Sequence, residues 1–389
     1  MVAERRLPAM RIALFTECYH PIVNGVVVSV ETFARELEKQ GHEVHIYAPS
    51  YPGYADPEGN VHRLPSIALP TRPRYPLALP FGSRFLASVI AAHPPDIVHA
   101  QHPFFTGREA RRLARRLRRP LLLTYHTLIR AYAHYIPLPR PLVQALAVWV
   151  SREFSNSTDC VVVPTHSVAD VLRSYGVWRP IEVIPTGIDL EMIDTGERHP
   201  TRERFGIPPD VPVVAYTGRI AREKNLDLLI EAFAILARRS PEAHLLLIGG
   251  GPWHAHCRRL SESLGIAERV HFTGYLPRPE VFDCLAESEV FAFASLTDTQ
   301  GVSVLEAMAL GCPAVAVRSG AVEDVIRDGI DGVLTDPDTE AFAQGMASLL
   351  DSEDLRGKLA GQARSRAEEF SAGRMAEKLV RLYARLIGG

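Results

Sequence analysis

The sequence predicts an α/β protein of two domains, each a doubly wound parallel sheet with helices on both faces. The length of 389 residues allows two domains of ordinary size. Apolar strand-like runs alternate with amphipathic helical stretches along most of the chain, which is the pattern of parallel sheets covered by helices. The polar, proline-bearing run from Glu197 to Asp210 interrupts this alternation and precedes a new strand-like run, so it marks the domain boundary.

Six short apolar runs in the N-terminal half have the length of buried strands. They cover residues 12–16, 44–48, 97–101, 121–125, 160–164 and 181–184. After the first run, Asn24-Gly25 opens a helix that Gly41 ends. Gly25 lets the backbone at this helix start approach an anionic group, although an ordinary strand-to-helix turn has the same pattern.

A basic helical run begins at Arg108 and ends at Arg119, and its apolar residues form one stripe that should pack on the sheet. The arginines then face outward, either as an ordinary solvated face or as a surface for anionic lipid head groups. Two apolar segments, 67–90 and 128–150, fit an acceptor groove or segments at a membrane interface. They fit core helices equally well.

The fourth strand-like run is followed by His126, which places an imidazole at the carboxyl edge of the predicted sheet. A lone histidine is more often a structural residue than a functional one. Glu17 and His20, which follow the first strand, are weaker candidates for the same edge.

Three strand-like runs of the C-terminal half, 212–216, 245–248 and 270–272, each lead into a glycine turn. The first turn carries Arg219 and Lys224, which can close on a diphosphate, the arginine as a fork and the lysine as a point charge. The other two turns contain Gly250 and Gly274, the latter followed by Tyr275. Charge-rich loops and lone glycine turns are also common at protein surfaces.

The stretch from Thr297 to Gly311 follows another apolar strand and precedes a helix over residues 302–310. Ligands of an open parallel sheet bind beyond the carboxyl ends of its strands, which is where this loop should lie. Asp298 and Glu306 bracket the helix start, and both can accept hydrogen bonds from sugar or ribose hydroxyls. In the alternative interpretation, Asp298 only caps the helix and Glu306 faces water.

Composition excludes several other classes. A net charge of −2 argues against a nucleic-acid-binding protein. The five cysteines are scattered without a paired framework, which favours reduced thiols in the cytoplasm. The apolar runs are too short for a signal-peptide core or a membrane span, so we expect membrane contact to be peripheral. His254, His256 and Cys257 lack a fourth ligand nearby, and we predict no metal site.

The pattern Asp-x7-Glu followed by Ala-Met-Ala-x-Gly-Cys-Pro-Ala-Val resembles the Glu-x7-Glu signature of retaining GT-B glycosyltransferases of family 4. Asp298 stands where the family usually has Glu, which shortens the reach of the carboxylate by about 1.5 Å. Gly218-Arg219-x4-Lys224 matches a second motif of the family. Asn24-Gly25-Val26 is similar to the first glycine loop of members that glycosylate diacylglycerol or phosphatidylinositol-type lipids.

This resemblance covers nearly the whole chain and implies a GT-B fold, in which two Rossmann-like domains face across a cleft. Residues 1–190 would form the acceptor-binding domain and residues 191–370 the nucleotide-sugar-binding domain. Residues 371–389 would form a helix that crosses back to the first domain. The donor would be a UDP- or GDP-sugar, with no other cofactor and no metal ion.

The resemblance also implies roles for individual residues. Arg219 and Lys224 would bind the diphosphate, and Glu306 would hold the ribose diol. Loops of the kind that contain Gly250, Gly274 and Tyr275 surround the nucleotide base and ribose. Asp298 would bind sugar hydroxyls with the backbone of its loop, and His126 would contact the reacting centre. The remaining predicted substrate-binding residues are Gly25, Thr299, Gln300, Gly301 and Val302.

The activity predicted in this way is transfer of a hexose, with retention of configuration, to a membrane lipid such as diacylglycerol or a glycolipid. We expect the protein in the cytoplasm, with peripheral association at the inner membrane face through the helix between Arg108 and Arg119. A soluble or polyprenyl-linked saccharide is the alternative acceptor. From a different class, the same fold serves nucleotide-sugar-binding proteins without transfer, epimerases and phosphorylases.

Overall fold

The computed structural model describes residues 8–22, 24–57, 59–69, 72–78, 90–130, 138–194 and 199–389. The chain divides into two compact units. Unit 1 consists of residues 1–187 together with 372–389, and unit 2 consists of residues 188–371. The polar run from Glu197 to Asp210 thus lies inside unit 2, and the division precedes it.

Unit 1 is built on a seven-stranded sheet with the strand order β3-β2-β1-β6-β7-β8-β9, in which all neighbouring strands are parallel. The strands are β1 (Arg11–Phe15), β2 (Glu43–Pro49), β3 (Val61–Leu64), β6 (Ile97–Ala100), β7 (Leu121–Thr124), β8 (Cys160–Val163) and β9 (Ile181–Val183). Most positions of the central strands are buried, as expected for a parallel sheet that is covered on both faces. The six strands predicted in this half are confirmed to within one residue at each end.

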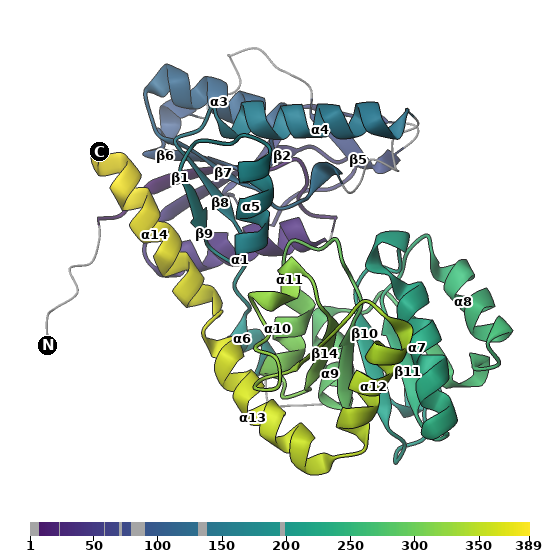
Figure 1. Ribbon diagram of the computed structural model, residues 1–389. Coiled ribbons are helices and arrows are strands. Elements are labelled where there is room, and N and C mark those ends of the chain that lie inside the picture. Colours follow the sequence, from purple (N-terminus) through teal and green to yellow (C-terminus); the bar gives the residue numbers. More distant parts are fainter. Residues whose placement is uncertain are drawn as a thin grey trace, which may run out of the picture. The chain divides into compact units, whose positions relative to one another are not determined.

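Helices cover both faces of this sheet (Figure 1). The helices α1 (Gly25–Lys39) and α14 (Ala372–Gly388) contribute to the core on one face. On the other face, the core includes side chains of α3 (Phe105–Leu117), α4 (Arg140–Ser155) and α5 (His166–Ser174). The arginine-rich helix α3 buries Ala110, Leu113 and Ala114, which confirms the predicted apolar stripe.

The segment from residue 66 to 78 differs from one of its interpretations. It forms an antiparallel pair, β4 (Ser66–Leu69) and β5 (Arg72–Ala78), so the suggestion of a core helix is wrong here. Pro73 and Pro76 explain the difference, because proline lacks the backbone N–H that a helix interior needs. Residues 79–89 of the same predicted segment, and 131–137 of the second, lie outside the described residues.

Unit 2 is built on a six-stranded parallel sheet with the order β12-β11-β10-β13-β14-β15. Its strands are β10 (Val213–Thr217), β11 (His244–Ile248), β12 (Val270–Gly274), β13 (Val290–Phe293), β14 (Ala314–Val317) and β15 (Val333–Thr335). Its helices are α6 (Leu190–Ile193), α7 (Leu226–Arg239), α8 (His254–Ser263), α9 (Arg278–Ala286), α10 (Val302–Ala309), α11 (Gly320–Glu323), α12 (Thr339–Leu350) and α13 (Glu353–Glu368). Side chains of α7, α8 and α12 form the core with one set of strand residues, and those of α9 and α10 with another.

The C-terminal helix α14 belongs to unit 1 although it follows unit 2 in the chain. It packs beside α1, and Met375, Leu379 and Tyr383 are buried in the unit 1 core. The hydroxyl of Tyr383 lies 2.7 Å from Nδ1 of His99 in β6. None of the helices in the described part of the chain combines the length and apolar character needed to span a lipid bilayer.

The buried side chain of His99 makes the free energy of unfolding of unit 1 depend on pH. This imidazole is 2% exposed, and burial lowers its pKa to about 3. A histidine in the unfolded chain, with a pKa near 6.5, binds a proton that the folded protein excludes, so stability falls as the pH drops below about 6.5. Between pH 6.5 and 5, His99 should account for a loss of roughly 1.5 kcal/mol of unfolding free energy.

We expect urea unfolding at pH 7, 6 and 5 to show this loss, and His99→Gln to flatten the pH dependence. His199→Gln is the matched control because His199 is exposed. An unchanged pH dependence in His99→Gln would contradict the assignment, whatever its absolute stability.

Candidate functional site

The unit 2 sheet changes its direction of growth beside β10. The chain adds β11 and β12 on one side of β10, and then β13, β14 and β15 on the other. Because β10 and β13 are parallel neighbours, the loops that follow them leave the same edge of the sheet side by side. Such a switch point is where open α/β sheets bind ligands.

An ion pair joins the two loops at this switch point. Lys224, in the short turn η3 (Arg222–Lys224) after β10, donates from Nζ to Oδ1 of Asp298 at 2.5 Å. The two side chains are only 18% and 15% exposed. Two further hydrogen bonds connect the loops. The Thr297 hydroxyl donates to the carbonyl oxygen of Glu223 at 3.0 Å. The Asn225 Nδ2 donates to the carbonyl oxygen of Ala294 at 3.2 Å. The structure therefore brings two of the predicted site residues into direct contact.

Arg219, the other predicted cation, is also paired with a carboxylate. Its guanidinium binds Glu223, whose side chain is buried while that of Arg219 is 42% exposed. An ammonium carries three N–H donors and a guanidinium five. Pairing with Glu223 and Asp298 thus orients the two cations, and each pair uses fewer N–H donors than its cation carries.

Asp298 does not cap the helix α10. The N-cap position is occupied by Gly301, and no side chain caps the helix start. A Cβ on Gly301 would lie 3.0 Å from the side chain of Val304, so the turn into the helix is tightly packed. The interpretation of Asp298 as a capping residue is wrong, and its carboxylate is committed to Lys224 instead.

Glu306 is buried, with 6% of its surface exposed, and does not face water as the alternative interpretation held. Its Oε1 accepts from Nη2 of Arg278 at 2.6 Å. Arg278 begins α9, after β12, and was not identified from the sequence. The available signal was the isolated acid in an apolar helix, which requires a partner. The chain has 43 lysines and arginines, so the isolated acid alone could not show which of them is its partner.

The glycine turn after β11 fits closely against the end of β10. Gly218 N donates to the Ile248 oxygen and Ile220 N to the Gly250 oxygen, both at 3.0 Å, while Gly249 N donates to the Gly274 oxygen at 3.0 Å. A Cβ on Gly249 would lie 2.1 Å from the carbonyl oxygen of Gly218. Gly249 also has a φ of +131°, which side chains disfavour. The loops after three neighbouring strands are thus linked through their backbones.

The ring of Tyr275 lies against the glycine turn that follows β11. A Cβ on Gly250 would come within 2.6 Å of the Tyr275 ring, so the ring rests on the glycine. The side chain is nevertheless 72% exposed. Such an exposed aromatic face, fixed from below, suits stacking against a planar group.

His126 lies at the corresponding edge of the unit 1 sheet, directly after Tyr125, which follows β7. Its Nε2 donates to Oε1 of Gln101, which follows β6, at 2.7 Å. Burial holds the pKa of His126 well below 6.5, and the neighbouring His102 and His99 lower it further. The imidazole is therefore neutral at physiological pH. Gln101, which the sequence analysis did not single out, orients it.

Gly25 is the first residue of α1, as predicted, and Asn24 is its N-cap. The Asn24 Oδ1 accepts from the backbone N–H groups of Val26 and Val27, both at 3.0 Å. Among the described residues, apart from the neighbours of Gly25 in the chain and its own helix, no protein atom lies within 4 Å of the position a Gly25 Cβ would take. The space is open to a ligand, but Asn24 already satisfies two of the donors at this helix start.

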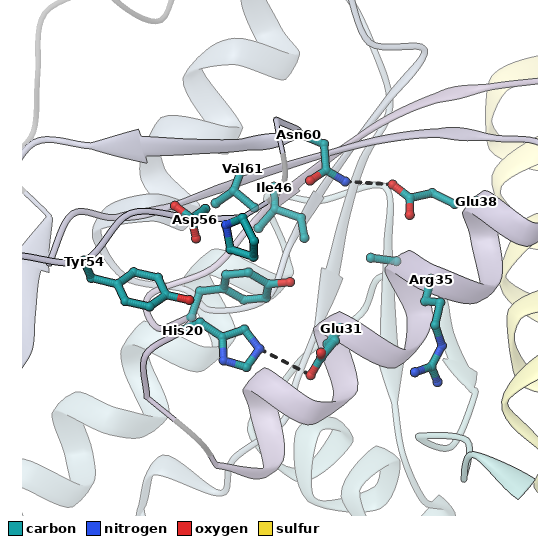
Figure 2. A pocket seen from close by; sticks show the side chains of 12 residues that line it. His20, Glu31, Arg35, Glu38, Ile46, Tyr54, Asp56, Asn60 and Val61 are labelled. Atoms are coloured by element: carbon teal, nitrogen blue, oxygen red, sulfur yellow. Dashed lines mark hydrogen bonds and ion pairs between the residues drawn. The ribbon is translucent and has the colours of Figure 1, made fainter. Parts of the chain in front are cut away.

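Glu17 and His20, the weaker candidates, point to different partners. Glu17 accepts from the backbone N–H and hydroxyl of Thr106 at 2.7 and 3.0 Å, and burial raises its pKa despite these bonds. His20 lies 3.4 Å from Glu31. Figure 2 shows this pair in a pocket of about 290 Å³ between α1 and the segment before β3. Apart from His20, none of the candidate site residues is among the residues that line this pocket.

One group of side chains in the described ranges has the composition of a metal site: Glu43, His45 and His93, with ligand atoms within 4.8 Å of one another. Glu43 Oε1 accepts from both histidines at 2.9 Å, and its Oε2 lies 3.1 Å from Arg11. Glu43 opens β2, at the amino edge of the sheet and away from His126. These groups satisfy one another, and we assign them a structural role.

Comparison with known proteins identifies the family. A model described as Glycosyltransferase Family 4 matches residues 23–192, and one described as Glycosyl transferases group 1 matches residues 197–366. The chain is 30% identical over 352 residues to an alpha-monoglucosyldiacylglycerol synthase of Streptococcus pneumoniae, covering 89% of this chain and 80% of that protein. This chain belongs to glycosyltransferase family 4. The resemblance noted in its motifs is confirmed.

This family 4 protein is also similar to a second sequence relative and to a solved structure. It is 29% identical over 333 residues to a GDP-mannose-dependent alpha-mannosyltransferase of Corynebacterium glutamicum, covering 84% of this chain and 77% of that protein. The structure of Anabaena HepE in complex with UDP-glucose superposes with a TM-score of 0.75 at 18% identity, covering 97% of this chain and 100% of that one. The predicted GT-B fold class, with two parallel-sheet α/β domains, is confirmed. The roles of the individual site residues stay predictions.

The Arg278–Glu306 pair can be tested by its effect on stability. Replacing Arg278 by Gln leaves a buried carboxylate without its cation, which should reduce the unfolding free energy by about 1–3 kcal/mol. Urea unfolding of the full chain measures the loss, and Arg278→Gln with Glu306→Gln should lose less than the sum of the single changes.

Arg204→Gln is the matched control, since Arg204 pairs with Glu280 with side chains that are 58% and 35% exposed. That change should alter stability by less than about 1 kcal/mol. Equal effects of the two arginine replacements would show that the buried pair has no special importance.

Proposed function

We propose that this protein is a retaining hexosyltransferase that moves a sugar from a nucleotide diphosphate sugar to a membrane lipid, with diacylglycerol or a glycolipid as acceptor. The observation that carries the proposal is the Lys224–Asp298 contact at the switch point of unit 2, which brings a cation suited to phosphate beside an acid suited to sugar hydroxyls. The similarity to an alpha-monoglucosyldiacylglycerol synthase supports the lipid acceptor.

The diphosphate of the donor would bind Arg219 and Lys224. As the bond between sugar and phosphate breaks, negative charge grows on the leaving phosphate, and fixed cations stabilise this state more than the bound donor. Glu223 and Asp298 hold the two cations in place before the donor arrives. This arrangement supplies the positive charge from side chains, so the proposed reaction needs no metal ion.

The sugar and the ribose would each meet one of the two acids. Asp298, held through Oδ1, would present its second oxygen to sugar hydroxyls, together with the backbone of Thr299, Gln300 and Gly301 and the first turn of α10 at Val302. Glu306, held through Oε1 by Arg278, would present its second oxygen to the ribose diol. A diol that binds a carboxylate through both of its hydroxyls requires a carboxylate of fixed orientation. Each of these ion pairs holds its carboxylate in one orientation.

The nucleotide base would lie against the exposed ring of Tyr275, above Gly250 and near Gly274. We propose UDP-glucose as donor, which HepE binds in its solved complex. GDP-mannose is the second candidate, because the GDP-mannose-dependent mannosyltransferase of Corynebacterium glutamicum is a relative at 29% identity.

Retention of configuration would follow from attack on the face of the sugar that the phosphate leaves. The acceptor hydroxyl oxygen forms the new bond to the anomeric carbon, the bond to the phosphate breaks, and the leaving phosphate takes the hydroxyl proton. His126, neutral and fixed by Gln101, would contact the transferred sugar through hydrogen bonds without adding charge. Gly25 would leave room for the acceptor at the start of α1.

The acceptor would lie in a membrane with anionic lipids. The arginines of α3 face outward, and each one near an anionic surface contributes roughly 1 kcal/mol of attraction. This proposal gives the helix between Arg108 and Arg119 a peripheral membrane role at the cytoplasmic face. A soluble or polyprenyl-linked saccharide is the alternative acceptor.

Replacement of Lys224 by Ala tests the diphosphate site. Loss of one such contact commonly lowers turnover by ~10²- to 10³-fold, and we expect this for transfer of radiolabelled glucose. Lys358→Ala, on the exposed side of α13, should keep the activity of the unchanged protein. Full turnover in a folded Lys224→Ala protein would remove Lys224 from the mechanism.

A donor and acceptor screen tests the function as a whole. UDP-glucose, UDP-galactose and GDP-mannose, each radiolabelled, are incubated with dispersed diacylglycerol, extracted lipids or soluble glycans, with and without EDTA. We expect label in the lipid phase from UDP-glucose, unchanged by EDTA. Label confined to soluble glycans would exclude the lipid acceptor, and loss with EDTA would exclude a metal-free reaction.

A further inference from the structure

The pocket of unit 1 in Figure 2 lies apart from the residues assigned to the donor and the reacting centre. One wall is a single side of α1, because Glu31, Ala34, Arg35 and Glu38 follow the i, i+3, i+4, i+7 spacing of a helix face. The rest of the lining comes from the loop after β1 and from β2, β3 and the connection between them. The volume of about 290 Å³ is near the lower limit of pockets that hold small molecules.

Arg63, in β3, fixes the side of the pocket that faces α1. Its Nε and Nη2 donate to the two carboxylate oxygens of Asp56, which lines the pocket, at 2.6 and 2.5 Å. The same guanidinium donates to the carbonyl oxygen of Pro49 at 2.8 Å and to that of His20 at 2.7 Å. One cation thus joins the loop after β1, the end of β2 and the connection to β3, and it holds this wall in place before any ligand binds.

Three tyrosine rings lie close to the Arg63 guanidinium. The ring centroids of Tyr19, Tyr51 and Tyr54 are 5.9, 5.4 and 5.5 Å from its Cζ, within the range of cation–π attraction. Tyr19 and Tyr54 line the pocket, and Tyr51 is not among the lining residues. The aromatic part of the lining is therefore fixed in orientation, and it offers an apolar ring surface to the C–H groups of a ligand.

The polar part of the lining combines hydrogen-bond acceptors with donors. Glu31 lies 3.4 Å from the Nε2 of His20, and Glu38 accepts from the Nδ2 of Asn60 at 2.7 Å (Figure 2). Arg35 lines the same pocket. Carboxylates only accept hydrogen bonds, whereas amide and guanidinium N–H groups donate them. A ligand that fits all of these groups must itself both donate and accept.

These features favour a neutral, polyhydroxylated ligand. The carboxylates of Glu31, Glu38 and Asp56 repel a phosphate, and Arg35 repels an ammonium group. An acyl chain would remove the polar side chains from water without replacing their hydrogen bonds, which costs free energy. A sugar meets the requirements, because its hydroxyls donate and accept while its C–H face lies against an aromatic ring.

We propose that this pocket binds a neutral hexose unit of the acceptor, other than the unit that receives the transferred sugar. Glu31 follows Gly25 by six residues, about 9 Å along the axis of α1, so the pocket lies beside the acceptor position proposed at the helix start. The inference rests on the transfer reaction proposed above. It narrows the acceptor to a molecule that already carries sugar, either a glycolipid or a soluble saccharide.

Saturation-transfer NMR of the full-length protein tests the pocket without any transfer reaction. The probes are methyl α-glucoside, methyl α-galactoside and methyl α-mannoside, each measured alone. We expect Tyr54→Ala to weaken binding of at least one probe by about tenfold through loss of the ring contact. Glu31→Gln, a change at an exposed side chain, should weaken it by about fivefold.

Tyr51→Ala is the matched control, because it also removes one ring from Arg63 but does not change the lining. This variant should bind the probe as the unchanged protein does. Binding of a probe at the donor site would be the same in both tyrosine variants, so the difference between them reports the pocket. The absence of binding by all three probes, or equal binding in Tyr54→Ala and Tyr51→Ala, overturns the hexose pocket.

Transfer assays then separate the two sources of the hexose. Detergent-dispersed diacylglycerol, dihexosyldiacylglycerol and soluble maltotriose are compared as acceptors of radiolabelled glucose from UDP-glucose. In Tyr54→Ala we expect the KM of the sugar-bearing acceptor to rise by about tenfold with kcat unchanged. A rise for the dihexosyl lipid identifies a glycolipid, and a rise for maltotriose identifies a soluble saccharide.

Two outcomes distinguish this inference from the proposed function. Transfer with the same KM in Tyr54→Ala as in the unchanged protein, for every acceptor, rejects the pocket as an acceptor site and leaves the transferase function intact. Probe binding that Tyr54→Ala weakens, without transfer to any acceptor from any donor, supports the hexose pocket and rejects the proposed reaction.

Discussion

Parallel strand pairing is the constraint on which the site depends. In each of the two parallel sheets all strands end at one edge, so residues that are far apart in the sequence leave the sheet together wherever the chain switches sides. In unit 2 the switch falls between β10 and β13, which places Lys224 beside Asp298. In unit 1 it falls between β1 and β6, and the loops that follow these strands contain Glu17 and Gln101.

At the carboxyl edge of the unit 2 sheet, three carboxylates each lie against a cation, so none of these charges is buried without a partner. Lys224 holds Asp298, Arg219 holds Glu223 and Arg278 holds Glu306. Each pair avoids the large free-energy penalty of an isolated buried charge. The pairs also set the direction of the carboxylates and cations, which a site for a flexible, polyhydroxylated donor requires. The glycine turns complete the arrangement, because a side chain at Gly249 would push the loops apart.

Local sequence patterns were sufficient for much of this structure. Buried strands of a parallel sheet are short continuous apolar runs, so their positions and the loops after them, including Lys224 and Asp298, could be located. The strand β3 was missed because Val61-His62-Arg63-Leu64 is half polar and lies at the sheet edge. Arg278 and Gln101 were missed because their roles come from partners elsewhere in the chain, which no local spacing encodes. The exposure of Leu142, Leu146 and Trp149 on α4 could not be predicted, since an apolar residue in a helix looks the same in the sequence whether it lies in a core or at the surface.

The position of α14 determines the order in which the protein can be completed during synthesis. Unit 2 is one continuous stretch, so its core is fully synthesised once residue 371 has left the ribosome. Unit 1 begins first, but its core still lacks Met375, Leu379 and Tyr383, and His99 lacks its hydroxyl partner. A nascent chain therefore carries an open apolar face on α1 until α14 has been synthesised. Unit 1 therefore begins before unit 2 in the chain and closes after it.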